Sequence, residues 1–140
     1  MVGRFDGGKI TSDAGGLLLR GVEKRTRMMS QFAQCFRDER KENFVEHSVE
    51  ELVRQRVYGL ALGYEDLNDH DELREDFLLA TLVGKEDPTG ESRVQKRDRG
   101  KPLAGKSTLN RLELYSEGKP KDRYKKIAVD GEGVGRFWVK

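Results

Sequence analysis

The sequence predicts a mainly α fold: a small helical module with a short N-terminal extended segment and an exposed basic loop. Residues 46–62 carry the longest amphipathic pattern in the chain, and early strand character is confined to the words VGRF and KI. Charged residues make up 37% of the chain against 35% hydrophobic ones. This lean composition is typical of a highly solvated module, although 140 residues are enough to bury a core.

The central helix is predicted over residues 48–62. Its apolar stripe consists of Val49, Leu52, Val53, Val57, Leu60 and Ala61, with the stem of Arg56 among them. Ser48 followed by Glu51 forms a capping-box pattern, in which each side chain satisfies an amide at the start of a helix. Gly63 can adopt the left-handed conformation that ends one.

Shorter helices are expected on both sides of this one. The apolar residues Leu17, Leu18, Leu19 and Val22 indicate an early helix capped by Thr11, Ser12 or Asp13, and Met28, Met29, Phe32, Ala33, Cys35 and Phe36 indicate another. We expect residues 37–46 to be a polar connector whose Phe44 and Val45 staple the central helix. Residues 64–76 are predicted to form a helix with Leu67, Leu73 and Phe77 facing inward, and residues 77–83 a buried segment ended by Gly84.

Composition divides the chain into three parts. Residues 1–84 are expected to be a helical core module, residues 85–106 a basic exposed loop or linker, and residues 107–140 a helical segment. Within the last part, Asp122 is a candidate cap for a helix RYKKIAV, and Asp130 for a second one that leads to Trp138. The chain stops on apolar residues, which is typical of a segment that continues into a missing domain.

Three sequence words carry a resemblance to a known family. They are FDGGKITSDAGG, HSVEELVRQRVYGLALGYEDLNDHDELRED and LAGKSTLNRLE. They resemble the N-terminal part of bacterial insertion-sequence transposases of the DDE, RNase H-like class. The resemblance implies that the full-length enzyme cuts transposon ends and joins a 3′ hydroxyl to target DNA, with Mg²⁺ as its metal. It also implies that the first catalytic aspartate lies beyond this region, so that no catalytic residue and no cofactor are expected in this chain.

The basic segment is the candidate DNA-binding site. Between residues 93 and 111, seven cations stand against one acid, Asp98, and lysine and arginine are the residue types that contact DNA phosphates. Ser107 or Thr108 can cap a following helix, whose free amides would also suit a phosphate. The candidate residues are Arg93, Lys96, Arg97, Arg99, Lys101, Lys106, Ser107, Asn110 and Arg111.

An alternative remains open. The basic segment can be a solvated surface loop, in which case the chain is a structural or oligomerisation module whose helix 48–62 packs on a partner subunit. The word GKPLAGKS fits the spacing of a nucleotide-binding P-loop, but the charged residues 91–99 stand where such a loop needs a buried strand. Nucleotide hydrolysis is therefore not expected.

The acidic run 65–76 permits two interpretations. Asp66, Asp69 and His70 are weak candidates for a divalent metal site if they converge on one face. The interpretation we favour is a solvated helix start, where acids complement the helix dipole. No metal site is therefore expected in this chain.

The remaining expectations concern environment and partners. Cys35 is the one cysteine, so an intrachain disulfide is excluded, and its apolar neighbours predict a buried residue. The sequence contains neither a membrane-length apolar run nor a secretory leader. We expect a cytoplasmic protein without membrane contact, with transposon ends and target DNA as partners and a possible homo-oligomer.

Overall fold

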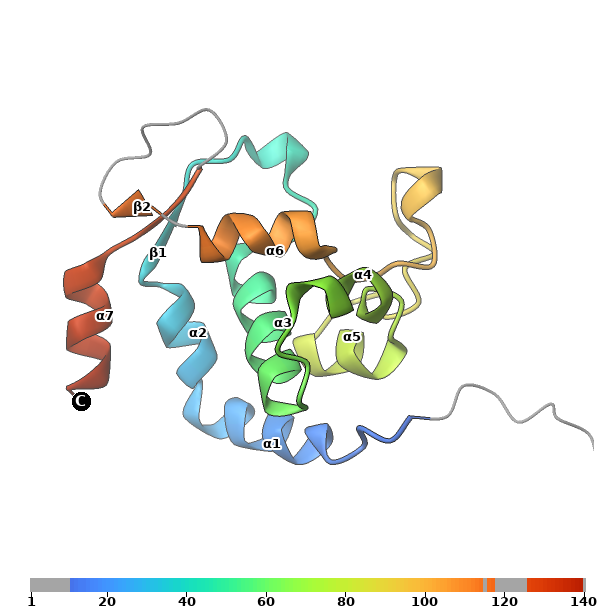
Figure 1. The fold of residues 1–140 in the computed structure, drawn as a ribbon, viewed down its shortest axis with the longest axis horizontal. Helices are drawn as coiled ribbons and strands as arrows, with labels where there is room; N and C mark the ends of the chain where they lie inside the picture. The colour runs from blue at the N-terminus through green and yellow to red at the C-terminus, as the bar shows by residue number, and fades with distance from the viewer. Residues whose placement is uncertain (1–10, 115, 118–125, 140) are drawn as a thin grey trace, which may run out of the picture.

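The computed structural model describes residues 11–114, 116–117 and 126–139, and over these the mainly α fold is confirmed (Figure 1). The α-helices are α1 (Gly16–Thr26), α2 (Met28–Ala33), α3 (Val49–Ala61), α4 (His70–Leu73), α5 (Phe77–Val83), α6 (Lys106–Glu113) and α7 (Gly131–Trp138). The 3-10 turns are η1 (Glu42–Phe44), η2 (Leu67–Asp69) and η3 (Lys96–Asp98), and the strands are β1 (Phe36–Asp38), β2 (Ser116–Glu117) and β3 (Ile127–Val129).

Helix α3 is the centre of the fold and packs against α2, α5 and α6. One buried cluster joins α2, α3, α6 and β3, and the other joins α3 to α5 and to the segment before α6. The first cluster includes Leu52, Val53, Leu109 and Ile127. Leu52 and Val53 of the predicted stripe are therefore buried by other parts of the same chain, whereas Leu60 and Ala61 at the end of the helix are exposed.

The predicted ends of α3 are confirmed. The Ser48 hydroxyl accepts the Glu51 amide at 3.2 Å, and the Glu51 carboxylate accepts the Ser48 amide at 2.9 Å. Gly63 follows the helix with φ of 97°, a left-handed conformation that favours glycine. These local signals fix both ends without help from the rest of the fold.

Arg56 has a structural role that explains its place in an apolar stripe. Its guanidinium donates to the carbonyls of Tyr64 and Glu65 at 3.1 and 2.7 Å, and it forms an ion pair with Glu113 of α6. Because one planar group reaches all three partners, it fixes the turn after α3 and connects that turn to α6.

The sheet was not predicted. Strand β3 pairs antiparallel with β1, with Phe36 opposite Val129, and parallel with β2. Phe36, expected in a helix, therefore lies in a strand, and the expected helix RYKKIAV is wrong at Ile127–Val129. Ile127 is buried and β-branched, and its pairing with a distant segment outweighs the local helical pattern. Asp122 and the early words VGRF and KI lie outside the described residues.

Helix α1 is present, but its start and its packing differ from the prediction. Gly15 is its N-cap, and no side chain caps it. Its apolar residues are largely exposed, and Leu18 is 78% exposed. Gly16 is buried against Leu82 of α5, and Glu23 is buried where its carboxylate accepts the amides of Met29 and Ser30 in α2.

Two further predictions needed correction. Residues 64–76 do not form one helix but the short elements η2 and α4, after which Asp76 accepts the Leu79 amide at 2.6 Å and starts α5. Phe77 is half-exposed, and Phe44 is 82% exposed, so neither has the inward role expected of it. By contrast, α5 ends at the left-handed Gly84 as predicted.

The segment 85–106 is only partly an exposed loop. Residues 102–105 are buried, and Leu103 is fully enclosed in the cluster with Tyr58 and Leu82. The expected boundary at residue 106 therefore does not coincide with the edge of the core. Cys35 is buried, as its apolar neighbours predicted.

Candidate nucleic-acid interface

The basic loop around η3 is closed at its base. The Gly100 amide donates to the Gly90 carbonyl at 3.2 Å, and Gly90 adopts φ of 73° against the backbone of Lys101 and Pro102. A Cβ at Gly90 would lie 2.7 Å from the Pro102 nitrogen, so glycine is required for this contact. The loop thus leaves and rejoins the core at one place, next to buried Leu103.

Arg93 stabilises the loop from inside. Its guanidinium donates to the Lys101 carbonyl at 2.6 Å and to Glu46 at 2.6 Å, and it lies 3.8 Å from Asp98. Asp98 in turn forms an ion pair with Arg74 at 3.3 Å. The expected DNA contact at Arg93 is not available in this arrangement, because its charge is already paired within the chain.

Three cations of the loop point to solvent. Lys96, Arg97 and Arg99 are exposed, and the Arg97 side chain is 80% exposed with only a 3.5 Å contact to the neighbouring Asp98. Lys96 and Arg99 form no ion pair with any described residue. Figure 1 shows the η3 loop projecting from one end of the ribbon, and we call these three residues the η3 cations.

The start of α6 differs from the prediction. Gly105 is its N-cap, rather than Ser107 or Thr108. The Asp71 carboxylate accepts the Lys106 amide at 3.0 Å, and the Lys106 ammonium lies 3.0 Å from the Asn68 side-chain oxygen and 3.6 Å from Asp71. A carboxylate of the protein thus already occupies the position that a phosphate would take at this helix end.

The other candidates on α6 share its outer face. Ser107, Asn110 and Arg111 are exposed, whereas Leu109 and Leu112 are buried against the core. Lys101, the remaining candidate, is half-buried in the segment that returns to the core. The structure therefore divides the predicted residues into the η3 cations, the outer face of α6, the internally paired Arg93 and Lys106, and the half-buried Lys101.

Side chains of the acidic stretch form hydrogen bonds within the fold. The Asp66 carboxylate accepts the Asn68 amide at 2.8 Å, which lowers its pKa. His70 is buried, and its Nδ1 accepts a hydrogen bond of 3.1 Å from the amide of Gln55, whose orientation is fixed by two bonds to Ala104. Burial lowers the pKa of His70, which favours the neutral ring that accepts this hydrogen bond.

These positions do not fit the metal expected of the full-length family enzyme. Among the described residues, no group of three His, Cys, Asp or Glu side chains converges as a metal site needs. His70 is committed to the core, and Asp66 to its own turn. No chemical step is therefore assigned to Asp66, Asp69 or His70.

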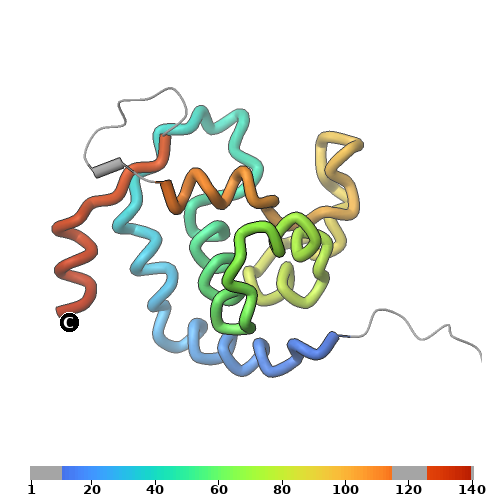
Figure 2. Tube along the Cα trace, in the orientation of Figure 1, coloured from blue at the N-terminus to red at the C-terminus, as the bar shows by residue number. Residues whose placement is uncertain are grey.

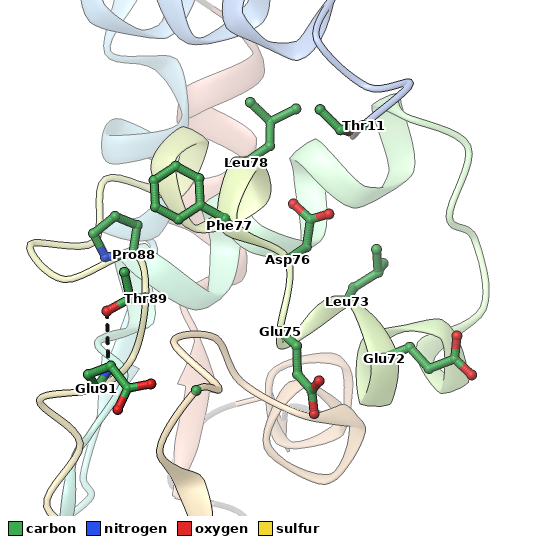
Figure 3. A pocket seen from close by; sticks show the side chains of 11 residues that line it. Thr11, Glu72, Leu73, Glu75, Asp76, Phe77, Leu78, Pro88, Thr89 and Glu91 are labelled. Atoms are coloured by element: carbon green, nitrogen blue, oxygen red, sulfur yellow. Dashed lines mark hydrogen bonds between the residues drawn. The ribbon is translucent and has the colours of Figure 1, made fainter. Parts of the chain in front are cut away.

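A second surface feature is an open groove of about 890 Å³ between the α4–α5 region and the start of the η3 loop (Figure 3). Its floor includes Leu73 and Leu78, and acids line it: Glu72, Glu75, Asp76 and Glu91. Such a lining repels phosphate. The sequence predicted an acidic run, but not that a glutamate from the loop would join it.

The comparisons place the chain among the transposases. A family model described as "Transposase DDE domain group 1" matches residues 1–130, and the chain belongs to this family. Neither a curated protein nor a solved structure matches it. Among the described residues, no helix is long and apolar enough to cross a membrane.

Proposed function

We propose that this chain is the N-terminal DNA-binding and assembly portion of a DDE-type transposase and does not itself carry the catalytic carboxylates. Membership of the family supports the transposase role. The observation that carries the DNA contact is the exposure of the η3 cations on a loop whose own base is internally paired. In this proposal the partners are transposon ends and target DNA, and Mg²⁺ is bound by acids outside this chain.

The rigidity of the loop supports this assignment. Phosphate contacts gain most when the cations are held in place before binding, because less side-chain and loop entropy is then lost. Arg93 and the Gly90–Gly100 hydrogen bond hold the base of the loop, and they leave Lys96, Arg97 and Arg99 exposed. Arg97 and Arg99 have only long contacts of 3.5 Å, to Asp98 and to the Arg93 carbonyl. Arg93 thus supports binding without contacting DNA.

The proposal is tested with the triple variant Lys96→Ala, Arg97→Ala, Arg99→Ala. Fluorescence anisotropy with a labelled duplex from the inverted repeats flanking the gene, against a scrambled duplex, measures affinity and preference. We expect the triple variant to bind at least about tenfold more weakly, since three phosphate contacts are removed. If the triple variant keeps both the affinity and the helicity of the parent chain, this loop does not contact DNA.

A matched control uses three exposed cations at the other end of the ribbon. Arg37 lies in β1, Lys126 directly precedes β3, and Lys41 directly precedes η1; all three are exposed. Replacing all three by alanine changes the net charge by the same amount. We expect its affinity to stay within about twofold of the parent chain, because general attraction alone is weaker than direct contact. If both triple variants lose the same DNA affinity, net charge alone explains the effect.

The alternative function is a structural or oligomerisation module, and one observation favours it. Helix α1 exposes Leu17, Leu18, Leu19 and Val22 on a small domain, where such residues are usually buried. Helix α3, the earlier candidate for a partner contact, buries Leu52, Val53 and Tyr58 against the same chain instead. Sedimentation equilibrium of the parent chain and of Leu18→Gln with Val22→Gln tests this function, since self-association through α1 disappears in the variant.

A further inference from the structure

A small hollow is lined by residues of α1, α2, α3 and α5. Figures 1 and 2 show that these helices lie together, away from the η3 loop. Its volume is about 270 Å³. Its charged lining consists of Arg20, Lys24, Arg27 and Arg54 with the two acids Glu23 and Glu50. Cations therefore outnumber carboxylates by two to one around it.

Both carboxylates already have donors. Glu23 accepts the amides of Met29 and Ser30 at 2.9 and 3.1 Å and the Ser30 hydroxyl at 3.2 Å. Glu50 forms an ion pair with Arg54 at 2.6 Å and also accepts from Ser30 at 2.7 Å. The acceptors of the hollow are thus satisfied by the protein itself.

Several donors, by contrast, have no acceptor. Tyr58 is fully buried among the residues that line the hollow, and its hydroxyl has no hydrogen-bond partner; the Nε of Arg54 is likewise unpaired, and each of the two atoms exposes less than 1 Å², so a ligand reaches them only when the side chains that cover them move. Arg20, Lys24 and Arg27 form no ion pair within the described part of the chain. A buried hydroxyl without a partner costs about 1–3 kcal/mol, so an acceptor at this place is favourable.

Burial keeps the Tyr58 hydroxyl protonated, and therefore able to donate. Burial raises the pKa of Tyr58, and Glu23 adds to this, whereas Arg54 and Arg20 act in the opposite direction. Of the lining residues, Lys24 and Arg27 are exposed, whereas Tyr58, Leu82 and Val83 are buried. The hollow therefore combines cations near solvent with a neutral donor at depth.

We propose that this hollow binds a phosphate group, with the Tyr58 hydroxyl and the Arg54 Nε as donors inside and Arg20, Lys24 and Arg27 around the opening. A phosphate offers several acceptor oxygens and negative charge together, which matches unpaired donors under an excess of cations. A free phosphate and a phosphate of a DNA backbone share this chemistry. The site is independent of the η3 loop and does not rest on the function proposed above.

The test is isothermal titration calorimetry of the full chain with sodium phosphate, against sodium chloride at equal ionic strength. We expect Tyr58→Phe and Arg20→Ala each to weaken phosphate binding by about tenfold, the value of one hydrogen bond to a charged group. Arg25→Ala is the control, since Arg25 is exposed on the same helix but does not line the hollow. Its affinity for phosphate should equal that of the parent chain.

Folding of Tyr58→Phe is checked separately. In phosphate-free buffer its Tm should equal or exceed that of the parent chain, because the hydroxyl has no bond to lose. The absence of phosphate binding by the parent chain, or equal affinities in the parent, Tyr58→Phe and Arg20→Ala, would overturn the proposal.

Duplex DNA distinguishes the two sources of the phosphate. If Tyr58→Phe weakens both phosphate and DNA binding, the hollow receives a backbone phosphate. If it weakens phosphate binding alone, the ligand is a free phosphate or a small phosphate ester. A failed DNA contact at the η3 cations appears only in the triple variant and leaves the calorimetry with phosphate unchanged.

Discussion

Gly59 lies inside α3, where helix propensity alone would favour alanine. A Cβ at this position would lie 2.9 Å from the Cε1 of His70 and 3.1 Å from its Nε2. We therefore expect Gly59→Ala to reduce the free energy of unfolding by about 1–3 kcal/mol through overpacking. Urea denaturation measures this change.

Gly21 supplies the control for that substitution. It lies inside α1, and a Cβ there meets no atom within 4 Å. Gly21→Ala is expected to leave stability unchanged or to raise it by up to about 1 kcal/mol. If both substitutions stabilise the protein, the close packing of Gly59 and His70 is wrong.

His47 is expected to make stability depend on pH. Burial, with Lys85 next in effect, lowers the pKa of His47 to about 3, and the Lys85 ammonium lies 3.0 Å from its Nδ1. Below about pH 6.5 His47 therefore binds a proton in the unfolded state but not in the folded state. Stability is full above that pH and falls as the pH drops toward 3.

The slope of this loss can be measured before the carboxylates titrate. Between about pH 6.5 and 5, His47 contributes at most about 1.4 kcal/mol of lost stability per pH unit, and His70, whose pKa is also lowered, adds in the same direction. Thermal unfolding in this range should show a shallower slope for His47→Gln. An identical slope in the parent chain and the variant would contradict the assignment.

Ser48 and Ser107 both lie at the start of a helix, but only Ser48 caps one. Ser48 accepts the Glu51 amide at the start of α3, whereas Ser107 lies within α6 and caps nothing. Ser48→Ala should cost about 1 kcal/mol of stability, and Ser107→Ala should change it by less than about 0.5 kcal/mol. Denaturation midpoints measure both changes in stability. Equal losses in the two variants would show that Ser107 also caps its helix.

The elements that the sequence predicted correctly carry their signals locally. Helix α3 has a capping box, an apolar stripe and Gly63, and α5 has an apolar run and Gly84. Strands β1 and β3 have no such signal, because three residues pair with three others about ninety positions away. The exposure of the α1 leucines could not be predicted from the sequence either. An apolar pattern does not show whether another part of the chain covers those residues.

The same limit applies to the candidate site. A basic segment could be recognised from composition, but ion pairs such as Arg93 with Glu46 join residues far apart in the chain. Only the fold separates paired cations from free ones. The Tyr58 hollow was missed for the same reason, since its residues come from four separate helices, α1, α2, α3 and α5.

For the molecule as a whole, Leu103 tests whether the basic segment is part of the core. It is fully buried beside Tyr58 and Leu82, whereas Val94 in the same segment is 88% exposed. Leu103→Ala is expected to cost about 2–5 kcal/mol through the cavity that it leaves, and Val94→Ala less than about 0.5 kcal/mol. Guanidinium titrations measure both losses of stability. If Leu103→Ala and Val94→Ala both cost little, the whole segment is a linker outside the core.

The charge of the molecule is segregated in space as well as in sequence. The acidic groove and the η3 cations lie on one connected region, since Glu91 and Gly100 of the loop line the groove. DNA is therefore expected to approach the η3 cations from the side that the groove does not occupy.

The most direct test of the DNA contact is the salt dependence of binding. Each phosphate neutralised adds about 0.9 to the slope of log Kobs against log salt. The triple variant of Lys96, Arg97 and Arg99 should therefore show a slope shallower by about 2 to 3, while the control triple variant of Arg37, Lys41 and Lys126 keeps the parent slope. Identical slopes in the parent chain and the η3 variant would contradict direct contact between these cations and DNA.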